Sequence, residues 1–164
     1  IMNIAVIGYA TIFFGILLFI SDKNKEEKSF NRCISHKQSL IIGLYQVLAL
    51  IPGTSRSGIT ITAARFMKFN RVDAAKFSFL LSIPTLSAAF ILSSYKIYKL
   101  EEVSFNLLAL VAFIFSFLFS LITIKYFLIF LKKFSLNVFV VFRILLGTIL
   151  LAFYYSNYWT DLLV

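Results

Sequence analysis

An arginine and a cluster of hydroxyl side chains interrupt an otherwise apolar stretch, IPGTSRSGIT, at residues 51–60. Arg56 stands directly between Ser55 and Ser57. A guanidinium group, hydroxyl groups and the free backbone amides at the start of a helix are groups that bind phosphate in proteins. We therefore interpret this segment as an anion-binding site for which phosphate is the best-fitting ligand.

The residue types suggest a division of roles within this site. Arg56 is the principal candidate ligand. A charged side chain inside a membrane is energetically costly, so its presence there usually indicates a function. Ser55 and Ser57 are further candidates, although we expect one of them to cap the following helix. Glycines permit close approach of the backbone to a ligand, whereas threonine hydroxyls either bind it or satisfy a backbone carbonyl. The remaining candidate binding residues are Gly53, Thr54, Gly58 and Thr60.

The surrounding chain has the composition of a membrane protein. Hydrophobic residues make up 60% of it, 20 residues are phenylalanine and the mean hydropathy is +0.92, so a soluble domain of 164 residues could not bury its apolar side chains. Four apolar runs are long enough to cross about 30 Å of hydrocarbon. These runs are residues 3–20, 77–95, 105–124 and 138–155. We expect an all-α integral membrane protein with four transmembrane helices.

Residues 38–67 are expected to form a re-entrant helical hairpin and not a fifth span. Pro52 and Gly53 break the segment into halves, the second from Ile59, and at about 1.5 Å per residue these reach only about 21 Å and 14 Å. If the segment crossed the membrane, the loops would place seven lysines and arginines on one side and five on the other. If it returns, the numbers are ten and two, as the positive-inside rule requires. We predict entry from the cytoplasmic side, with both chain ends outside.

Several other features exclude alternatives. The net charge of +9 is explained by loop lysines that set topology, so no nucleic-acid partner is expected. Cys33 is the single cysteine and has neither a disulfide partner nor a neighbouring cysteine for a metal. The first apolar run lacks a basic leader and is followed by a charged loop, unlike a cleavable signal peptide. The chain starts at Ile1, which suggests a fragment.

The polar residues outside this segment receive structural interpretations. Arg65 and Arg71 lie near the predicted cytoplasmic end of the second half-helix, where long basic side chains extend to the interface. Asp73 is expected to cap a helix that begins at Ala74. Arg143 lies inside the last apolar run and needs a partner there, so we interpret it either as a structural pair or as part of the site wall.

The stretch GLYQVLALIPGTSRSGITIT resembles the second signature of the undecaprenyl-diphosphatase family, also called bacitracin-resistance proteins. The resemblance continues through FNRVDAAKFSFLLSIP at residues 69–84 and includes the arginine at position 143. It covers essentially all 164 residues as a single membrane domain. A PGTSRSG block inside a hydrophobic hairpin is highly specific, whereas a lone SRS triplet would not be.

This resemblance implies a hydrolase of the bacterial inner membrane that removes the terminal phosphate from undecaprenyl diphosphate. The product is the lipid carrier used in peptidoglycan and cell-wall synthesis, and the family is linked to bacitracin resistance. In such a protein Ser55, Arg56 and Ser57 would hold the diphosphate, with Thr60 nearby. The implied fold is a helical bundle of two inverted halves, each with a re-entrant hairpin, and the implied cofactor is a divalent cation, Mg²⁺ or Ca²⁺.

The chain departs from the family pattern in one respect. The family carries a first signature, a Glu-rich hairpin followed by a Ser-Ser-Thr-Gly-His-like segment, and this chain has none of it. Its only histidine, His36, lies in a basic loop, and its seven acidic residues lie outside the four apolar runs. These acids are Asp22, Glu26, Glu27, Asp73, Glu101, Glu102 and Asp161. We therefore expect the C-terminal part of such an enzyme, whose missing N-terminal half supplies the metal ligands and the catalytic acid or base.

Three alternatives compete with this interpretation. The same anion site could belong to a lipid-phosphate carrier or translocase without hydrolysis, since transporters hold anions at the ends of broken helices. The chain could also be an inactive remnant. A second class of membrane lipid phosphatase uses a Ser-Arg pair followed by a catalytic histidine, but no histidine follows Arg56.

Overall fold

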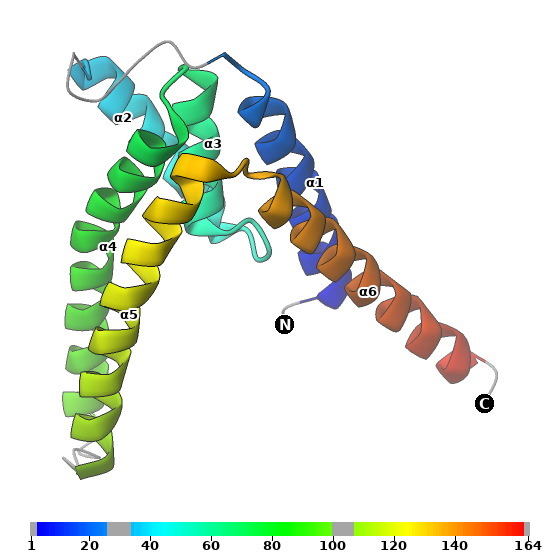
Figure 1. The fold of residues 1–164 in the computed structure, drawn as a ribbon. Helices are drawn as coiled ribbons and strands as arrows, with labels where there is room; N and C mark the ends of the chain where they lie inside the picture. Colours follow the sequence, from blue (N-terminus) through cyan, green and yellow to red (C-terminus); the bar gives the residue numbers. More distant parts are fainter. Residues whose placement is uncertain (1–2, 26–33, 100–106, 163–164) are drawn as a thin grey trace.

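The computed structural model describes residues 3–25, 34–99 and 107–162, and these contain helices and no strand. The α-helices are α1 (Ile4–Asp22), α2 (His36–Tyr45), α3 (Arg56–Phe66), α4 (Arg71–Lys99), α5 (Leu107–Lys133) and α6 (Asn137–Leu162), and a 3₁₀ helix, η2 (Gln46–Leu50), continues α2 (Figure 1). By length and composition α1, α4, α5 and α6 could each cross a membrane. The all-α fold with four candidate spans is therefore confirmed.

Helix α4 begins earlier than the apolar pattern suggests. The side chain of Asn70 accepts a hydrogen bond of 2.8 Å from the backbone amide of Asp73 and donates one of 2.8 Å to the Asp73 carboxylate. Asn70 is therefore the cap and Asp73 its reciprocal partner in the first turn. The prediction that Asp73 caps a helix from Ala74 is wrong, because the reciprocal bonds start the helix at Arg71.

Residues 36–66 fold as a helical hairpin. The chain runs down α2 and η2, turns at residues 51–55 and returns along α3, so that the start of α2 and the end of α3 lie at the same end of the molecule (Figure 1). The second arm starts at Arg56 and not at Ile59, because the Ser55 hydroxyl accepts a hydrogen bond of 3.2 Å from the Gly58 amide and caps the helix. The cap predicted for one of the two serines is thus Ser55.

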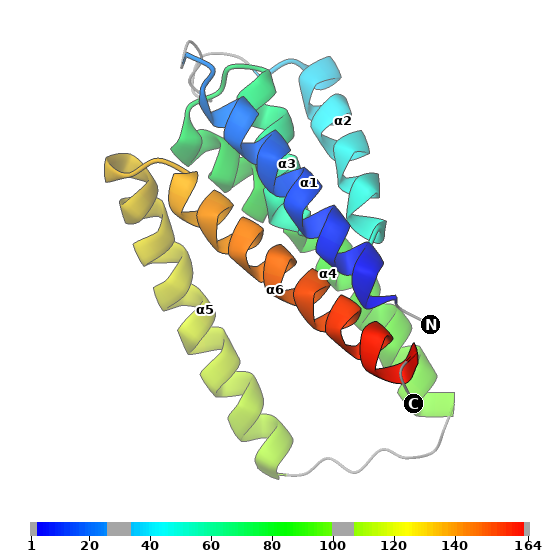
Figure 2. The same cartoon turned by 90° about the vertical axis from the view of Figure 1, so that its right-hand side faces the viewer.

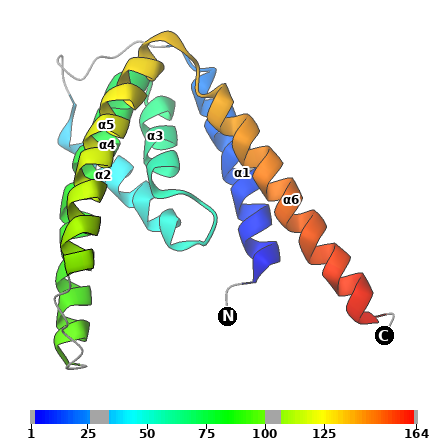
Figure 3. The ribbon, with the colours of Figure 1, turned by 60° about the horizontal axis from the view of Figure 1, so that its bottom comes forward.

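The hairpin lies between two pairs of long helices. Helix α3 packs against α4, which is paired with α5, and also against α1, which is paired with α6. Figure 3 shows the turn of the hairpin directed toward α1. Figure 2 shows α1 beside α6, with the connections after α1 and before α6 at one end of the molecule. This arrangement brings the turn of the hairpin close to residues from the first and last helices of the chain.

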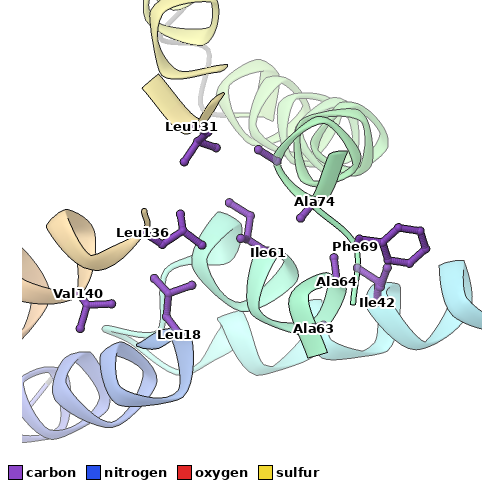
Figure 4. Packing of buried hydrophobic residues seen from close by; sticks show 11 residues of the cluster. Leu18, Ile42, Ile61, Ala63, Ala64, Phe69, Ala74, Leu131, Leu136 and Val140 are labelled. Carbon is purple, nitrogen blue, oxygen red and sulfur yellow. The ribbon is translucent and has the colours of Figure 1, made fainter. Parts of the chain in front are cut away.

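A hydrophobic core fixes the end of α3 remote from the turn. Small residues allow close packing there, since Ala63 and Ala64 on α3 and Ala74 and Ala75 on α4 are almost completely buried. Larger side chains from α1, α2, α5 and α6 and from the residues just before α4 and α6 close around them (Figure 4): Leu18, Ile42, Phe69, Leu131, Leu136 and Val140. Elsewhere the large apolar side chains of α4, α5 and α6 are mostly exposed, as suits helices that face lipid.

A buried carboxylate stands at the same end. Asp22, the last residue of α1, accepts hydrogen bonds from Arg71 Nε at 2.7 Å, Arg71 Nη2 at 3.2 Å and the Leu136 amide at 3.1 Å. Arg65 Nε lies 3.4 Å from the same carboxylate. One acidic side chain therefore ties together the ends of α1 and α3 and the starts of α4 and α6.

Arg65 is one of the most deeply buried side chains in the structure, at 1% exposed. Beyond its ion pair, it donates to the backbone carbonyl oxygens of Asp22, Asn24 and Phe69 at 2.9, 2.8 and 2.7 Å. The prediction that Arg65 extends to the membrane interface is wrong, because its side chain is buried against the Asp22 carboxylate. Arg71 pairs with the same carboxylate but keeps 29% of its side chain exposed.

Candidate functional site

The turn of the hairpin is held against α1 at Gly53. Gly53 has a φ of 93°, a conformation that favours glycine, and an added Cβ would lie 2.5 Å from the carbonyl oxygen of Ile7 and 2.9 Å from Thr11 Oγ1. Thr11 Oγ1 also donates a hydrogen bond of 3.3 Å to the Gly53 carbonyl. Only a residue without a side chain allows the turn to approach α1 so closely.

Arg143 connects this turn to both α1 and α6. Its Nη2 donates hydrogen bonds of 2.8 Å to the carbonyl oxygens of Gly53 and Thr54, and its Nε donates one of 3.3 Å to the Thr11 carbonyl. The side chain also lines the pocket beside the turn. Arg143 therefore combines the two roles considered for it, since it makes structural hydrogen bonds and forms part of the pocket wall.

A pocket of about 490 Å³ opens beside the turn. The residues that bring polar groups to it are Thr11, Gly53, Ser55, Ser57, Gly58 and Arg143. The rest of the wall is apolar and comes from α1, α3, α5, α6 and the residue before α6: Ile7, Leu18, Ile61, Phe127, Leu136, Phe139, Phe142, Leu146 and Leu150. A ligand that fills such a space would be an amphiphile, with a polar group at the turn and a hydrocarbon part along the helices.

The polar part of the pocket coincides with the N-terminus of α3. The first amides of a helix have no partner within the helix, and together with the helix dipole they attract anions. Ser55 and Ser57 are both exposed and bracket the first residue of α3. Ser55 has a φ of 67°, so the backbone departs from ordinary geometry just where the pocket begins. The arrangement suits an anion such as phosphate.

Four of the seven predicted site residues meet at this pocket: Gly53, Ser55, Ser57 and Gly58. Arg56 is half-buried beside them but is not part of the wall, and its guanidinium makes no hydrogen bond or ion pair within the described residues. It is a cation at the start of a helix with nothing in the described structure to neutralise it.

The two predicted threonines lie behind the wall. Thr60 is 1% exposed, its hydroxyl is 2.7 Å from the Ser78 hydroxyl and it also bonds the carbonyls of Arg56 and Ser57. Thr54 is fully buried, and its hydroxyl has no hydrogen-bond partner within the described part of the chain. The structure does not bring either hydroxyl to the pocket.

Sequence reasoning did not find Thr11 or the apolar wall. Thr11 is one hydroxyl within an apolar run, and no spacing rule connects it with Gly53 or Arg143, which are 42 and 132 residues away along the chain. Within the described ranges, no three His, Cys, Asp or Glu side chains gather as a metal site, so these residues do not fit the divalent cation implied by the resemblance.

The chain is similar to known proteins over most of its length. Residues 1–149 match the family described as bacitracin resistance protein BacA. An undecaprenyl-diphosphatase of Pelagibacter ubique is 46% identical over 154 residues, which are 94% of this chain and 60% of that protein. Similar proteins of the same name from Campylobacter curvus and Erythrobacter litoralis are 46% and 41% identical, over 55% and 52% of their lengths. The chain thus spans between about half and three-fifths of these relatives.

Proposed function

This chain belongs to the bacitracin resistance protein BacA family, and we propose that the complete polypeptide carrying it hydrolyses undecaprenyl diphosphate to undecaprenyl phosphate and inorganic phosphate. The observation that carries the proposal is the pocket at the hairpin turn, which joins phosphate-binding groups to a long apolar wall. Relatives named undecaprenyl-diphosphatase support the choice of ligand.

The two parts of the pocket match the two parts of this substrate. The aromatic and aliphatic side chains of α5 and α6 offer a surface for a prenyl chain, which would bind there by burial of apolar surface. The start of α3 offers hydroxyls, amides and a helix dipole to the diphosphate. In this scheme the substrate remains in the bilayer while its headgroup reaches the turn.

Arg56, Ser55 and Ser57 are assigned to the diphosphate. The Arg56 guanidinium has no partner in the described structure, so it is free to rotate toward a phosphate beside Ser57 without breaking a bond. Once in contact with the phosphate, a guanidinium and hydroxyls stabilise the charge on the phosphoryl oxygens as the bond to the terminal phosphate breaks. Gly53 and Gly58 line the pocket without a side chain, so a ligand can approach their backbone. Thr54 and Thr60 are buried next to the turn and do not contact the ligand.

We place the protein in the bacterial inner membrane, with the hairpin entering from the cytoplasmic side, as the loop charges favour. The product would return to the lipid-carrier pool used for cell-wall synthesis. The residues that the structure describes hold no cluster of His, Cys, Asp or Glu side chains for a divalent cation.

One observation favours a second candidate function for these residues alone. No carboxylate or imidazole is among the side chains that line the pocket, so the lining supplies no general acid or base. The second candidate is a protein that binds or translocates a polyprenyl phosphate without hydrolysis.

Phosphate release from undecaprenyl diphosphate tests the proposal. The complete polypeptide is purified in detergent as wild type, Arg56→Gln and Lys125→Gln, the last a charge removed from an exposed position on α5. We expect Arg56→Gln to reduce the rate by about a hundredfold or more at an unchanged unfolding midpoint, and Lys125→Gln to match the wild type. A wild type that binds the lipid but releases no phosphate would favour the second candidate. A wild type that does neither would overturn both.

A further inference from the structure

We infer that Arg143 is a second phosphate-binding residue of this site, which contacts the diphosphate through Nη1, the one guanidinium nitrogen without a hydrogen bond to the described residues. The inference rests on the proposed function and adds a residue from another helix, 87 positions after Arg56, to the binding of its substrate. It makes Arg143 both the support of the hairpin turn and a ligand of the headgroup.

The hydrogen bonds of Arg143 leave one side of the guanidinium available. Nε and Nη2 donate to the three carbonyl oxygens of Thr11, Gly53 and Thr54. Nη1 makes no hydrogen bond to any residue that the structure describes. Since a guanidinium carries five donor hydrogens, Nη1 still has two to offer. The side chain lines the pocket, so these donors can reach a ligand there.

The position of Nη1 is marked by Gly58, in the first turn of α3. A Cβ added to Gly58 would lie 2.7 Å from Arg143 Nη1 and 3.1 Å from Ser55 Oγ. Arg143 Nη1 and the Ser55 hydroxyl therefore both lie close to one point in the first turn of α3. That is the place where the proposed function puts the diphosphate.

The charge of Arg143 also remains unbalanced in the described structure. Its partners are neutral carbonyl groups, and no carboxylate lies within ion-pair distance among the described residues, although the side chain is only 8% exposed. A buried charge without a counter-charge is costly in a membrane protein. An anionic ligand would supply the missing charge. The bonds to carbonyls fix the guanidinium in advance, so little conformational entropy is lost when the ligand binds.

Two variants separate phosphate binding from support of the turn. Arg143→Lys keeps a positive charge but loses the planar guanidinium with its several hydrogen-bond donors. Gly58→Ala keeps the arginine and its carbonyl partners but places a methyl group 2.7 Å from Nη1. Gly43→Ala is the matched control, because a Cβ there meets no atom within 4 Å. The dissociation constant of inorganic diphosphate for the complete polypeptide is measured from the ligand-induced shift of thermal unfolding, with KM and kcat for undecaprenyl diphosphate alongside.

We expect Arg143→Lys and Gly58→Ala each to weaken the binding of inorganic diphosphate about tenfold or more, as for a lost charged hydrogen bond. Gly43→Ala should bind like the wild type. The methyl group of Gly58→Ala would also lie 3.1 Å from Ser55 Oγ. The double variant Arg143→Lys/Gly58→Ala shows whether this methyl group acts through Nη1 or through Ser55. If the methyl acts through Nη1, then adding Gly58→Ala to Arg143→Lys causes no further loss.

Two results would overturn the inference, and they differ from failure of the proposed function. Diphosphate binding within twofold of wild type in both single variants would make Arg143 a purely structural residue, even if the unfolding midpoint falls. Full additivity in the double variant would show that Gly58→Ala acts through Ser55 and Arg143→Lys only through the hairpin turn, so Nη1 would not be a ligand. A wild type that neither binds diphosphate nor releases phosphate would instead remove the proposed function itself.

Discussion

Helix α3 carries an arginine at each end, and the two have opposite surroundings. Arg65, near the end of α3, is 1% exposed, pairs with Asp22 and donates to three carbonyls. Arg56, at the start of α3, is half-buried and makes no hydrogen bond or ion pair to the described residues. Both belong to one hairpin of 31 residues between two pairs of helices. The comparison teaches that the counter-charge, and not the residue type, separates a structural arginine from one available to a ligand.

The backbone shows the same contrast. Near the end of α3, small side chains pack closely in the core that surrounds Ala63 and Ala64. At its start, Gly53 and Ser55 both have positive φ angles, and the Thr54 hydroxyl is buried without a partner among the described residues. Strain and unsatisfied polar groups of this kind persist when surrounding contacts impose them, and they cluster at binding sites. Four substitutions test whether one end of α3 is built for stability and the other for binding.

The largest effect on stability is expected at the paired end. Asp22→Ala removes the counter-charge of Arg65 and Arg71 and an acceptor for the Leu136 amide, and should lower the free energy of unfolding by about 3–5 kcal/mol. Lys76→Gln is the control: the Lys76 side chain is 56% exposed and lies 3.9 Å from Asp73, and this pair should contribute less than about 1 kcal/mol. Denaturant unfolding in detergent measures both. Equal stabilities for the two variants would refute the structural role given to Asp22.

A smaller loss of stability is expected where the turn meets α1. Gly53→Ala imposes a positive φ on alanine and a clash with the Ile7 carbonyl, and should cost about 1–3 kcal/mol. It should also weaken diphosphate binding, because the turn must move away from α1. Gly43→Ala, with open space around the added methyl, is again the matched comparison. Normal binding by a destabilised Gly53→Ala protein would show that the position of the turn does not set the geometry of the site.

The smallest effects should distinguish the two serines. Ser55→Ala removes the cap on the Gly58 amide and should cost about 1 kcal/mol of stability as well as affinity for diphosphate. The Ser57 hydroxyl makes no hydrogen bond within the described residues, so Ser57→Ala should leave stability unchanged and weaken binding only about threefold to tenfold. Unfolding midpoints and dissociation constants of inorganic diphosphate measure the two effects separately. Equal losses of stability in both variants would contradict this distinction.

Much of the fold could be predicted from the sequence because it depends on local composition. Apolar length located α1, α4, α5 and α6, and the Pro52-Gly53 break together with the loop charges indicated the hairpin. The ends of the helices were harder to predict, because the caps formed by Ser55 and Asn70, and not hydropathy, determine where α3 and α4 begin.

The site was predictable only in part, for a different reason. Ser55, Ser57 and the glycines are neighbours in sequence and could be recognised as one anion-binding segment. Thr11 and Arg143 join them only through tertiary contacts with Gly53. The ion pairs of Asp22 likewise cross 43 and 49 residues, and no local pattern contains them. The Thr60 hydroxyl looked available until its contact with Ser78 placed it behind the wall.

The most direct test is the dissociation constant of inorganic diphosphate for the wild-type complete polypeptide and for Arg56→Gln. The guanidinium of Arg56 has no structural partner in the described residues, so its removal should leave the unfolding midpoint unchanged and weaken binding at least about tenfold. Equal affinity in the two proteins would contradict the assignment of the unpaired end of α3 to the ligand.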